Sequence, residues 1–528
     1  MRSLVLLFVW CATAKMAVSL AQHNDVPLNR DIYLDLDRNH ACRTSPVHTG
    51  LRPQIESRVD LTNVLGHRPD STRHYYILTK VLFKTHLIDV NKKGFRVVAD
   101  GVWNFELGQD FRDPSEFADT TRFYVNARGY RIAADIGARV SFSTTFYETQ
   151  AIYPQYLYQY VNIGGVVPGQ GRIKTTDQRG FDFSWAGGNV SWSPRRWVNV
   201  QFGHGKHFVG NGYRSVLLSD NAFNYPYLKH SWLLFKDRVQ YSSIMSKLQM
   251  VGEANRLPTG ESSESIFYWK RATFNHLSVN VGPAQIGLFE ATHWRTVQQG
   301  GSSAFNGMQL NPVIGINTLA YGFSSEGVNN MLGLDVKVKL TDKLFAYGQF
   351  ATDDPGRERF AWQAGLRMFD IFKQDLHLLL EYNSASAFTY GSATRNLGMV
   401  HYNQPMAHPL GANFTEAVGI LDYRKKRWFF TGKVNVAQII LQDTLGTDFG
   451  NNPLVQQLGV LGAADVPEVH RQLVHLDLSA GWIMNQNNNA RIVVGWTGRD
   501  LGLAADHLNS SYLYVALRTG LFNRYYDI

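Results

Sequence analysis

Residues 130–146 read YRIAADIGARVSFSTTF, and their side chains alternate between apolar and polar. The even positions carry the apolar set: Tyr130, Ile132, Ala134, Ile136, Ala138, Val140, Phe142 and Phe146. The odd positions carry most of the polar set: Arg131, Asp135, Arg139, Ser141, Ser143 and Thr145. A period of two places one set on each face of a β-strand. Because the stretch is long for a single strand, we expect a tight turn around residues 135–137 and therefore a β-hairpin.

The same alternation recurs along the chain, over residues 376–382, 428–436, 490–497 and 510–522. Turn-forming residues separate such runs: Ser193-Pro194, Gly282-Pro283, Asp354-Pro355-Gly356 and Asn487-Asn488-Asn489. Arg195 and Arg196, which follow Ser193-Pro194, are expected to lie in a hairpin turn. The pattern predicts an all-β chain.

A soluble β-sandwich and a membrane barrel both alternate in this way, and three features favour the barrel. The pattern runs through 528 residues without an obvious linker, which is long for one sandwich. The final segment of the sequence is also strand-like. Aromatic residues make up 13% of the chain, and many stand at expected strand ends, as in membrane girdles: Tyr75, Tyr76, Phe146, Tyr147, Trp192, Trp197, Trp269, Trp428 and Tyr512. We therefore predict a transmembrane antiparallel β-barrel of roughly 16 to 20 strands.

A barrel of that width encloses a lumen unless part of the chain fills it. Three stretches look unsuited to strands and are expected to fill or cap the lumen: residues 250–264, 296–330 and 442–470. The last continues into PLVQQLGVLGAADVPEVHRQLV at 453–474, which could hold a short helix. No internal repeat is evident.

The first 21 residues have the pattern of a secretory signal peptide. Arg2 precedes an apolar run over residues 4–14, and Ser19-Leu20-Ala21 is a small-x-small cleavage site. We therefore expect residues 1–21 to be a signal peptide and residues 22–528 to form a single barrel domain. Its one cysteine, Cys42, has no partner for an internal disulfide.

The chain carries a formal net charge of +9, of which Arg2 and Lys15 belong to the expected signal peptide. A basic chain favours acidic partners, which could be nucleic acid, lipid or acidic glycan. Because the chain is expected to be exported, nucleic acid is not expected among them. An exported barrel would have outer-membrane lipid and the cell surface as its surroundings.

The glycine-rich stretch GHGKHFVGNG at 203–212 invites a catalytic interpretation that its spacing does not support. It lacks the string of a phosphate-binding loop and the G-x-S-x-G of a nucleophile elbow. The positions two residues after His204 and His207 hold Lys206 and Val209, where outer-membrane phospholipases would need a serine. His204, His207 and His230 also lack metal-ligand spacing. We expect no enzyme activity, no cofactor and no metal.

Asp353 and Asp354, beside Pro355-Gly356, are expected in a solvated turn.

An aromatic row in YPQYLYQYV at 153–161 is a second candidate site. Tyr156, Tyr158 and Tyr160 would lie on one face of a strand. Such rows form membrane girdles or cores, and they also stack on sugar rings. Both interpretations stay open from the residues alone.

Several strings, in order along the chain, resemble the capsule-assembly Wzi-like family, in the version found in gliding or type IX-secreting Gram-negative bacteria. They are HTGLRP at 48–53, NARGYRI at 126–132, YETQAIYP at 147–154, GHGKHFVGNGYRSVLLSDNAFNYPYL at 203–228, LNPVI at 310–314, LFAYGQFATDD at 344–354, LEYNSASAFTY at 380–390 and HPLGANFTE at 408–416. The resemblance implies an outer-membrane barrel of about eighteen strands whose pore is occluded by loops and short helical segments. It also implies a lectin that binds and organises capsular polysaccharide, acting as a monomer.

In such a barrel, the stretch at 203–222 is expected to be an inward fold that plugs or gates the lumen. Gly203 and Gly205 would allow close packing, and residues 210–212 would supply the positive φ of a tight turn. Leu217, Leu218 and Ala222 would pack the fold. The polar candidates are Lys206, His207, Asn211 and Arg214. Contact with an acidic glycan is a second reading, because Lys and Arg donors suit uronate or phosphate groups.

Three functions remain open. The first is a non-enzymatic anchor that binds and organises surface polysaccharide, capsular or exopolysaccharide and acidic. The second is an outer-membrane accessory of type IX secretion or gliding motility, which would bind other proteins of those systems. The third is a diffusion porin.

Overall fold

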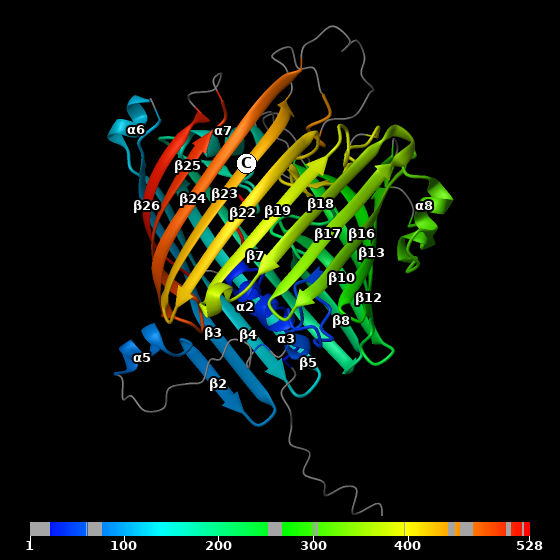
Figure 1. The fold of residues 1–528 in the computed structure, drawn as a ribbon, viewed down its shortest axis with the longest axis horizontal. Helices are drawn as coiled ribbons and strands as arrows, with labels where there is room; N and C mark the ends of the chain where they lie inside the picture. The colour runs from blue at the N-terminus through cyan, green and yellow to red at the C-terminus, as the bar shows by residue number, and fades with distance from the viewer. Residues whose placement is uncertain are drawn as a thin grey trace, which may run out of the picture.

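The wall of the molecule is one closed antiparallel β-barrel of 18 strands (Figure 1). The computed structural model describes residues 22–59, 61, 76–113, 115–251, 267–298, 301–302, 305–394, 396–441, 449–454, 468–502, 508–519 and 522–528. The barrel strands are β3 (Phe95–Asp110), β4 (Phe123–Ile136), β5 (Val140–Ile152), β7 (Phe181–Arg195), β8 (Val198–Gly205), β10 (Tyr225–Leu234), β11 (Val239–Val251), β12 (Phe267–Val281), β13 (Ala284–Arg295), β16 (Val328–Thr341), β17 (Leu344–Asp354), β18 (Arg359–Met368), β19 (Leu376–Ala385), β22 (Phe414–Lys425), β23 (Trp428–Leu441), β24 (Val469–Asn485), β25 (Ala490–Asp500) and β26 (Ser510–Thr519). The barrel closes where β26 pairs with β3. The sequence-based prediction of an all-β barrel is confirmed.

The hairpin predicted from residues 130–146 is β4 and β5, joined by a turn at 137–139. Tyr130 and Ile136 are about half exposed on the outer wall, at 48% and 51%, whereas Asp135 and Ser141 are buried inside. The inner polar groups are hydrogen-bonded to each other, because Ser141 Oγ donates to Asp135 Oδ1 at 2.6 Å. The apolar face is therefore the outside of the barrel and the polar face is its lumen, as expected for a membrane barrel.

The aromatic residues are only partly where a girdle was predicted. Trp192 and Trp197 are 49% and 47% exposed at the β7–β8 turn, and Trp428 is 66% exposed at the start of β23. Tyr147 and Tyr512, in contrast, are buried, and Tyr76 lies at the start of a helix. Tyr75 is outside the described residues. Trp192, Trp197 and Trp428 thus form an outer aromatic group near the hairpin turns, whereas two of the nine predicted members, Tyr147 and Tyr512, pack inside.

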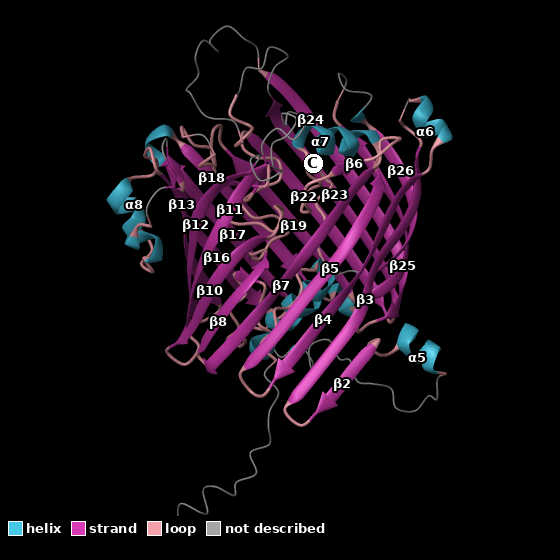
Figure 2. Ribbon diagram, turned by 180° about the vertical axis from the view of Figure 1, so that it is seen from behind, coloured by secondary structure: helices cyan, strands magenta, loops and turns pink. Residues whose placement is uncertain are grey.

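The two ends of the barrel differ. One end has short turns, and the other carries the longer connections and most of their helices (Figures 1 and 2). We call them the turn end and the loop end. The helices are α2 (Arg30–His40), α3 (Glu56–Val59), α5 (Ile77–Phe83), α6 (Glu116–Thr120), α7 (Gln155–Gly164) and α8 (Ile316–Tyr321), with short 3-10 helices η3 (Gly307–Leu310), η4 (Pro355–Arg357) and η5 (Ile371–Lys373). Among the described residues, no helix is both long and apolar enough to cross a bilayer.

Short strands outside the 18 form side pairings. They are β1 (Leu51–Arg52) with β9 (Phe208–Val209), β2 (Ile88–Lys92) with β3, β6 (Lys174–Thr175) with β7, β14 (Val297–Gln298) with β15 (Gly301–Ser302), and β20 (Val400–His401) with β21 (Gln404–Pro405). The β1–β9 pair joins the N-terminal segment to the segment that follows β8. These pairings therefore fix the positions of segments inside the barrel and at its two ends.

Residues 22–59 enter the turn-end half of the lumen, where α2 and α3 lie within the barrel (Figure 1), and cavities of about 790 and 650 Å³ remain between them and the wall. Asn29 caps α2, because its side chain accepts from the amides of Asp31 and Ile32. The acidic residues of α2 pair with arginines of the wall: Asp31 with Arg491, Asp35 with Arg424 and Asp37 with Arg367. This helix is thus held to several strands by charge-assisted hydrogen bonds.

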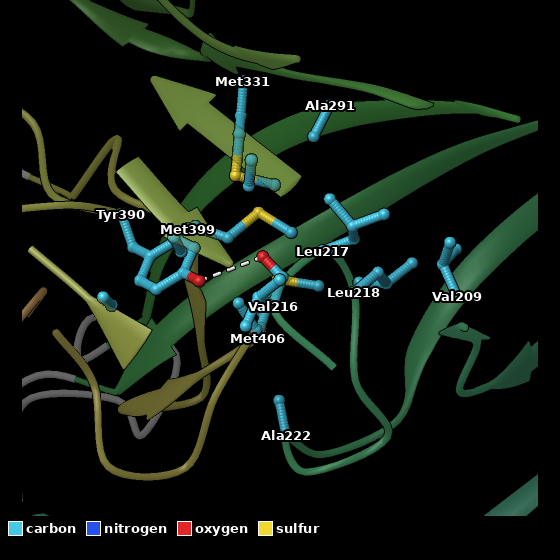
Figure 3. Packing of buried hydrophobic residues seen from close by; sticks show 14 of the residues in the cluster. Val209, Val216, Leu217, Leu218, Ala222, Ala291, Met331, Tyr390, Met399 and Met406 are labelled. Carbon is cyan, nitrogen blue, oxygen red and sulfur yellow. Dashed lines mark hydrogen bonds between the residues drawn. The ribbon is translucent and has the colours of Figure 1, made fainter. Parts of the chain in front are cut away.

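The segment between β8 and β10, residues 206–224, turns into the lumen as predicted, and we call it the inward loop. Val216, Leu217, Leu218 and Ala222 are buried in a cluster with side chains of the wall and of residues 386–413 (Figure 3). Tyr390 Oη donates to the carbonyl of Val216 at 3.0 Å. The middle of the lumen is therefore filled by packed apolar side chains.

The three stretches that were predicted to fill or cap the lumen differ in where the structure places them. Residues 252–264 lie outside the described residues, while 250–251 end β11. The expectation that residues 296–330 fill or cap the lumen is wrong for residues 305–323, which lie outside the wall because their polar groups bond to outward-facing residues of β13. Of 442–470, residues 442–448 and 455–467 lie outside the described residues. The core of the predicted helix and the predicted signal peptide at 1–21 lie outside them as well. Residues 449–454 pack on residues 386–413.

The prediction of a solvated turn at Asp353 is wrong. Asp353 is buried at the end of β17, where its Oδ2 accepts the backbone amide of Tyr390 at 2.7 Å. Asp354 does precede the turn η4, and Arg357 lies 3.4 Å from its carboxylate. The hairpin turn at Arg195 and Arg196 is confirmed between β7 and β8.

Leu217→Ala should destabilise the protein by about 2–5 kcal/mol, because it leaves a cavity in a packed cluster. Leu334→Ala is a matched control, since Leu334 is 38% exposed on the outer face of β16. Urea unfolding of the purified protein in detergent micelles measures both. Equal losses in the two variants would show that the inward loop is not packed as described.

Candidate functional site

Two regions contain the side chains singled out by the sequence. Lys206, His207, Asn211 and Arg214 all lie on the inward loop, and the structure brings them into the buried centre of the lumen. Tyr156, Tyr158 and Tyr160 lie on α7, between β5 and β7 at the loop end. The first set belongs to the connection between β8 and β10, and the second to the connection between β5 and β7.

Arg214 is the centre of a buried ion cluster. Its guanidinium donates to Glu416 on β22, with Nη2 2.9 Å from Oε1, and Nη1 lies 3.2 Å from Asp527 Oδ1. Lys433 on β23 contacts the other oxygen of Asp527, with Nζ 2.9 Å from Oδ2. These cations hold the pKa of Asp527 well below its usual range, although burial alone would raise it. The inward loop, the wall and residues 522–528 therefore meet at one guanidinium.

A neutral histidine completes the cluster. The backbone amide of Leu410 donates to His408 Nδ1 at 3.2 Å, so Nε2 carries the hydrogen that is donated to Glu416 Oε2 at 2.9 Å. Burial lowers the pKa of His408, against the opposing effect of Glu416. The ring therefore satisfies both contacts without a charge.

The remaining polar groups of the inward loop hold it to neighbouring loops and to the wall. Lys206 Nζ donates to the carbonyls of Gly169 at 2.6 Å and Asp220 at 3.1 Å, and burial lowers its pKa to about 8. His207 Nδ1 lies 3.1 Å from Tyr225 Oη, and Asn211 accepts a hydrogen bond from Thr49 Oγ1. Burial also lowers the pKa of His207 well below its ordinary value. All of these contacts are structural, in line with the predicted plug.

The glycines of this stretch mainly allow other atoms to pack close to the backbone, and fewer of them than expected form a tight turn. Only Gly210 has a positive φ, at +133°, whereas Asn211 and Gly212 do not. A Cβ on Gly203 would meet the Gly188 carbonyl oxygen at 2.7 Å and Tyr227 Oη at 2.9 Å. The expected packing at Gly203 is confirmed, and the expected positive φ holds at one residue of the three.

The tyrosine row is not a strand, which corrects the prediction for residues 156–160. In α7, successive residues are turned by 100°, so Tyr156 and Tyr160 share a side and Tyr158 points roughly opposite. Pro154 precedes the helix and Gly165 ends it with a φ of +69°. Tyr156 is buried, and the other two are half-buried.

A group of stacked rings and an arginine lies at the loop-end rim beside α7. Tyr158 stacks on Phe181 with ring centroids 5.4 Å apart. The guanidinium of Arg179 lies 4.5 Å from the ring centroids of both Tyr158 and Phe117. Lys174 on β6 is exposed nearby in the same connection. We call these residues, with α7, the cap.

A cavity of about 280 Å³ lies in the lumen beneath the cap. Tyr153 and Tyr156 line it from α7 and its start, and Arg491 and Arg518 line it from the wall. Arg499 lies 4.7 Å from the Tyr156 ring centroid. Aromatic faces beside guanidinium groups suit a ring that bears hydroxyl and acidic groups.

Sequence reasoning missed Arg179, Lys174 and Arg499. Arg179 lies in a turn with φ +61°, and Arg499 lies on β25 far along the chain. Neither stands near the tyrosine row in sequence with a recognisable spacing. Within the described residues, no group of three or more histidine, cysteine or acidic side chains is arranged to hold a metal ion.

No family model matches the chain, and no curated protein matches it. Among solved structures, the barrel is similar to Wzi, an outer-membrane protein involved in group 1 capsule assembly in Escherichia coli and described as a carbohydrate-binding β-barrel. The TM-score is 0.54 at 12% identity, over 95% of this chain and 100% of Wzi. OpdQ of Pseudomonas aeruginosa matches at a TM-score of 0.42 and 10% identity, over 81% of this chain and 98% of that one. The likeness to Wzi shows a shared fold, that of Gram-negative outer-membrane barrels.

Arg214→Met should cost about 3–5 kcal/mol, because it leaves two buried carboxylates without their main partner. Arg112→Met is the control, since Arg112 pairs with Asp500 at an exposed rim site and should matter by at most about 1 kcal/mol. Thermal unfolding in detergent measures both. A small loss in Arg214→Met would contradict the role assigned to the cluster.

Stability should fall as the pH drops below about 6.5. His408 stays neutral in the fold, so the unfolded chain binds the proton first and gains stability relative to the fold. His408→Gln keeps a donor toward Glu416 and should make the dependence of the unfolding midpoint between pH 7 and pH 5 less steep, while buried His207 still contributes in the same direction. His470→Gln, at an exposed position, should leave that dependence unchanged. An unaltered slope in His408→Gln would refute a neutral His408.

Proposed function

We propose that this protein is a non-enzymatic outer-membrane barrel that binds acidic polysaccharide at the cell surface and helps to organise it. Its loop end would face the outside, because membrane barrels have short periplasmic turns and longer outer loops. The observation that carries the proposal is the packed lumen. The Wzi-like fold, in a protein described as carbohydrate-binding, supports it.

The packed lumen argues against free diffusion as the main activity. A porin needs a continuous water-filled path, whereas Leu217, Leu218 and Met406 are completely buried in mid-lumen. The Arg214 cluster fixes the inward loop to the wall beside them. Because the packed lumen opposes diffusion of solutes, we propose that the barrel binds its ligand at the loop end.

The cap is the proposed glycan-binding surface. Tyr158 and Arg179 are partly exposed at the rim, where Arg179 Nη2 also donates to Gln155 Oε1, and Lys174 is exposed on β6 in the same connection. A sugar ring stacks on an aromatic face, and a uronate or phosphate accepts from Arg or Lys. The inward-loop cations Lys206 and Arg214 are already engaged by protein groups, so we assign them to the plug rather than to the glycan.

Purified protein should bind polygalacturonate, an acidic polysaccharide, more tightly than neutral dextran. Tyr158→Ala should weaken that binding about tenfold, which corresponds to about 1.4 kcal/mol. Tyr130→Ala, on the outer wall, is the control and should bind normally. In planar bilayers the wild type should pass little current.

The outcomes separate the alternatives. Porin-like current with no glycan preference would favour a diffusion porin. A protein without affinity for acidic glycan that co-purifies with secretion or motility proteins would favour an accessory of those systems. In cells lacking the gene, an anchor predicts constant total glycan with more of it in the medium.

A further inference from the structure

The connection between β15 and β16 folds back over the outside of the barrel. We call residues 305–323 the outer strap, which contains η3 and α8. In both views α8 stands outside the wall beside β13 and β16 (Figures 1 and 2). The described loop-end segments of 206–224 and 386–413, in contrast, turn inward.

The outward face of β13 changes from apolar to polar where the strap covers it. Ile286 and Leu288 of β13 are 40% and 44% exposed to the surroundings of the barrel. The next residues on the same face, Glu290 and Thr292, are fully buried although they also point outward. A carboxylate in the position of a lipid-facing residue is costly unless something covers it.

The strap covers these groups with hydrogen bonds. Thr318 Oγ1 donates to Glu290 Oε1 at 2.9 Å, and Asn317 Nδ2 donates to Thr292 Oγ1 at 3.2 Å. Further strap contacts, all with outward-facing groups of the wall, are Thr273 Oγ1 to the Gln309 carbonyl at 3.0 Å, Tyr241 Oη to the Pro312 carbonyl at 2.6 Å and Asn330 Nδ2 to the Gly322 carbonyl at 2.6 Å. The inner face of the strap is therefore polar and matched to the wall.

The outer face of the strap is apolar. Leu310, Val313, Ile316 and Leu319 are 50%, 54%, 39% and 83% exposed, and they continue the apolar outer surface of Ile286, Leu288 and Leu334. Four exposed large apolar side chains within ten residues are unfavourable in water. The strap thus replaces a polar patch of the wall with an apolar surface.

A basic pair stands on the loop-end side of the strap. Lys247 and Arg271 are cross-strand partners on the outward face of β11 and β12. Lys247 is exposed, with Nζ 3.7 Å from the Trp269 ring centroid. Basic residues with an aromatic ring at the edge of an apolar band match the level of lipid headgroups.

We propose that the outer strap is a lipid-binding element of the barrel. Its apolar face contacts acyl chains, and Lys247 binds the phosphate of an anionic lipid beside Arg271, whose Nη1 donates to Gln309 Oε1 of the strap at 3.3 Å. The choice of lipid as occupant rests on the continuity of the strap with the apolar outer wall and on the charge of the adjacent pair. This inference does not depend on glycan binding.

Spin labelling tests the position of the strap. Leu319→Cys in a Cys42→Ser background is labelled with a nitroxide and placed in vesicles of phosphatidylcholine and phosphatidylglycerol. We expect high accessibility to oxygen and low accessibility to a water-soluble nickel chelate, as for the lipid-facing reference Leu288→Cys. Accessibility like that of Glu326→Cys, whose side chain is 94% exposed, would overturn the proposal. Dipolar broadening from a second copy of the chain would overturn it as well.

Selectivity among spin-labelled lipids tests the headgroup contact. The wild type should prefer phosphatidylglycerol to phosphatidylcholine, and Lys247→Gln should reduce that preference about fivefold. Lys247 makes no described contact with the strap, so the variant leaves it in place. Lys92→Gln removes the same charge from an exposed site on β2, which pairs with β3 away from the strap, and should keep the preference. Equal behaviour of the two variants, or a wild type without preference, would refute the assigned phosphate site.

Discussion

A sheet that faces lipid must pair all of its backbone amides and carbonyls within itself, and this sheet does so by joining β26 to β3. Closing 18 strands in this way sets a width that the wall's own side chains cannot fill. Other segments of the chain therefore have to occupy the lumen. Residues 22–59, the inward loop, residues 386–413 and residues 522–528 all enter the space that closure creates, and their contacts with the wall explain why the inward faces of the strands are polar.

The contents of the lumen are held by two kinds of contact. The apolar cluster around Leu217 supplies burial, while Arg214, Glu416 and Asp527 fix one arrangement of the segments that meet there. A buried ion cluster contributes little net stability compared with apolar packing, but it makes wrong arrangements costly. We infer that the cluster mainly specifies the position of the inward loop. The same logic applies to α2, whose aspartates match arginines on several strands.

Local patterns in the sequence were sufficient for the wall and for part of the plug. The alternation at 130–146 predicts β4 and β5 with the correct faces, and the apolar run after Gly212 predicts an inward fold. The tyrosines at 156, 158 and 160 mislead because spacing by two fits a strand, whereas Pro154 and Gly165 mark the helix ends. Asp353 looked like a turn residue because its partner, the amide of Tyr390, is 37 residues away. Glu416 and Asp527 lie 202 and 313 residues from Arg214, and no local pattern connects them.

The two segments that flank the barrel in the chain also contact each other. The amide of Asn523 donates to the Leu28 carbonyl at 3.0 Å, and the amide of Arg30 donates to Asn523 Oδ1 at 2.8 Å. All 18 wall strands lie between these partners in sequence, so forming the contacts requires a very large loop to close. Contacts between residues so far apart in sequence are expected to form late, because a long loop has to close first. We therefore expect the interior to be sealed after most of the strand pairing. A closed wall with an unsealed interior would leak, and the rate of this last step would set how long such a leak lasts.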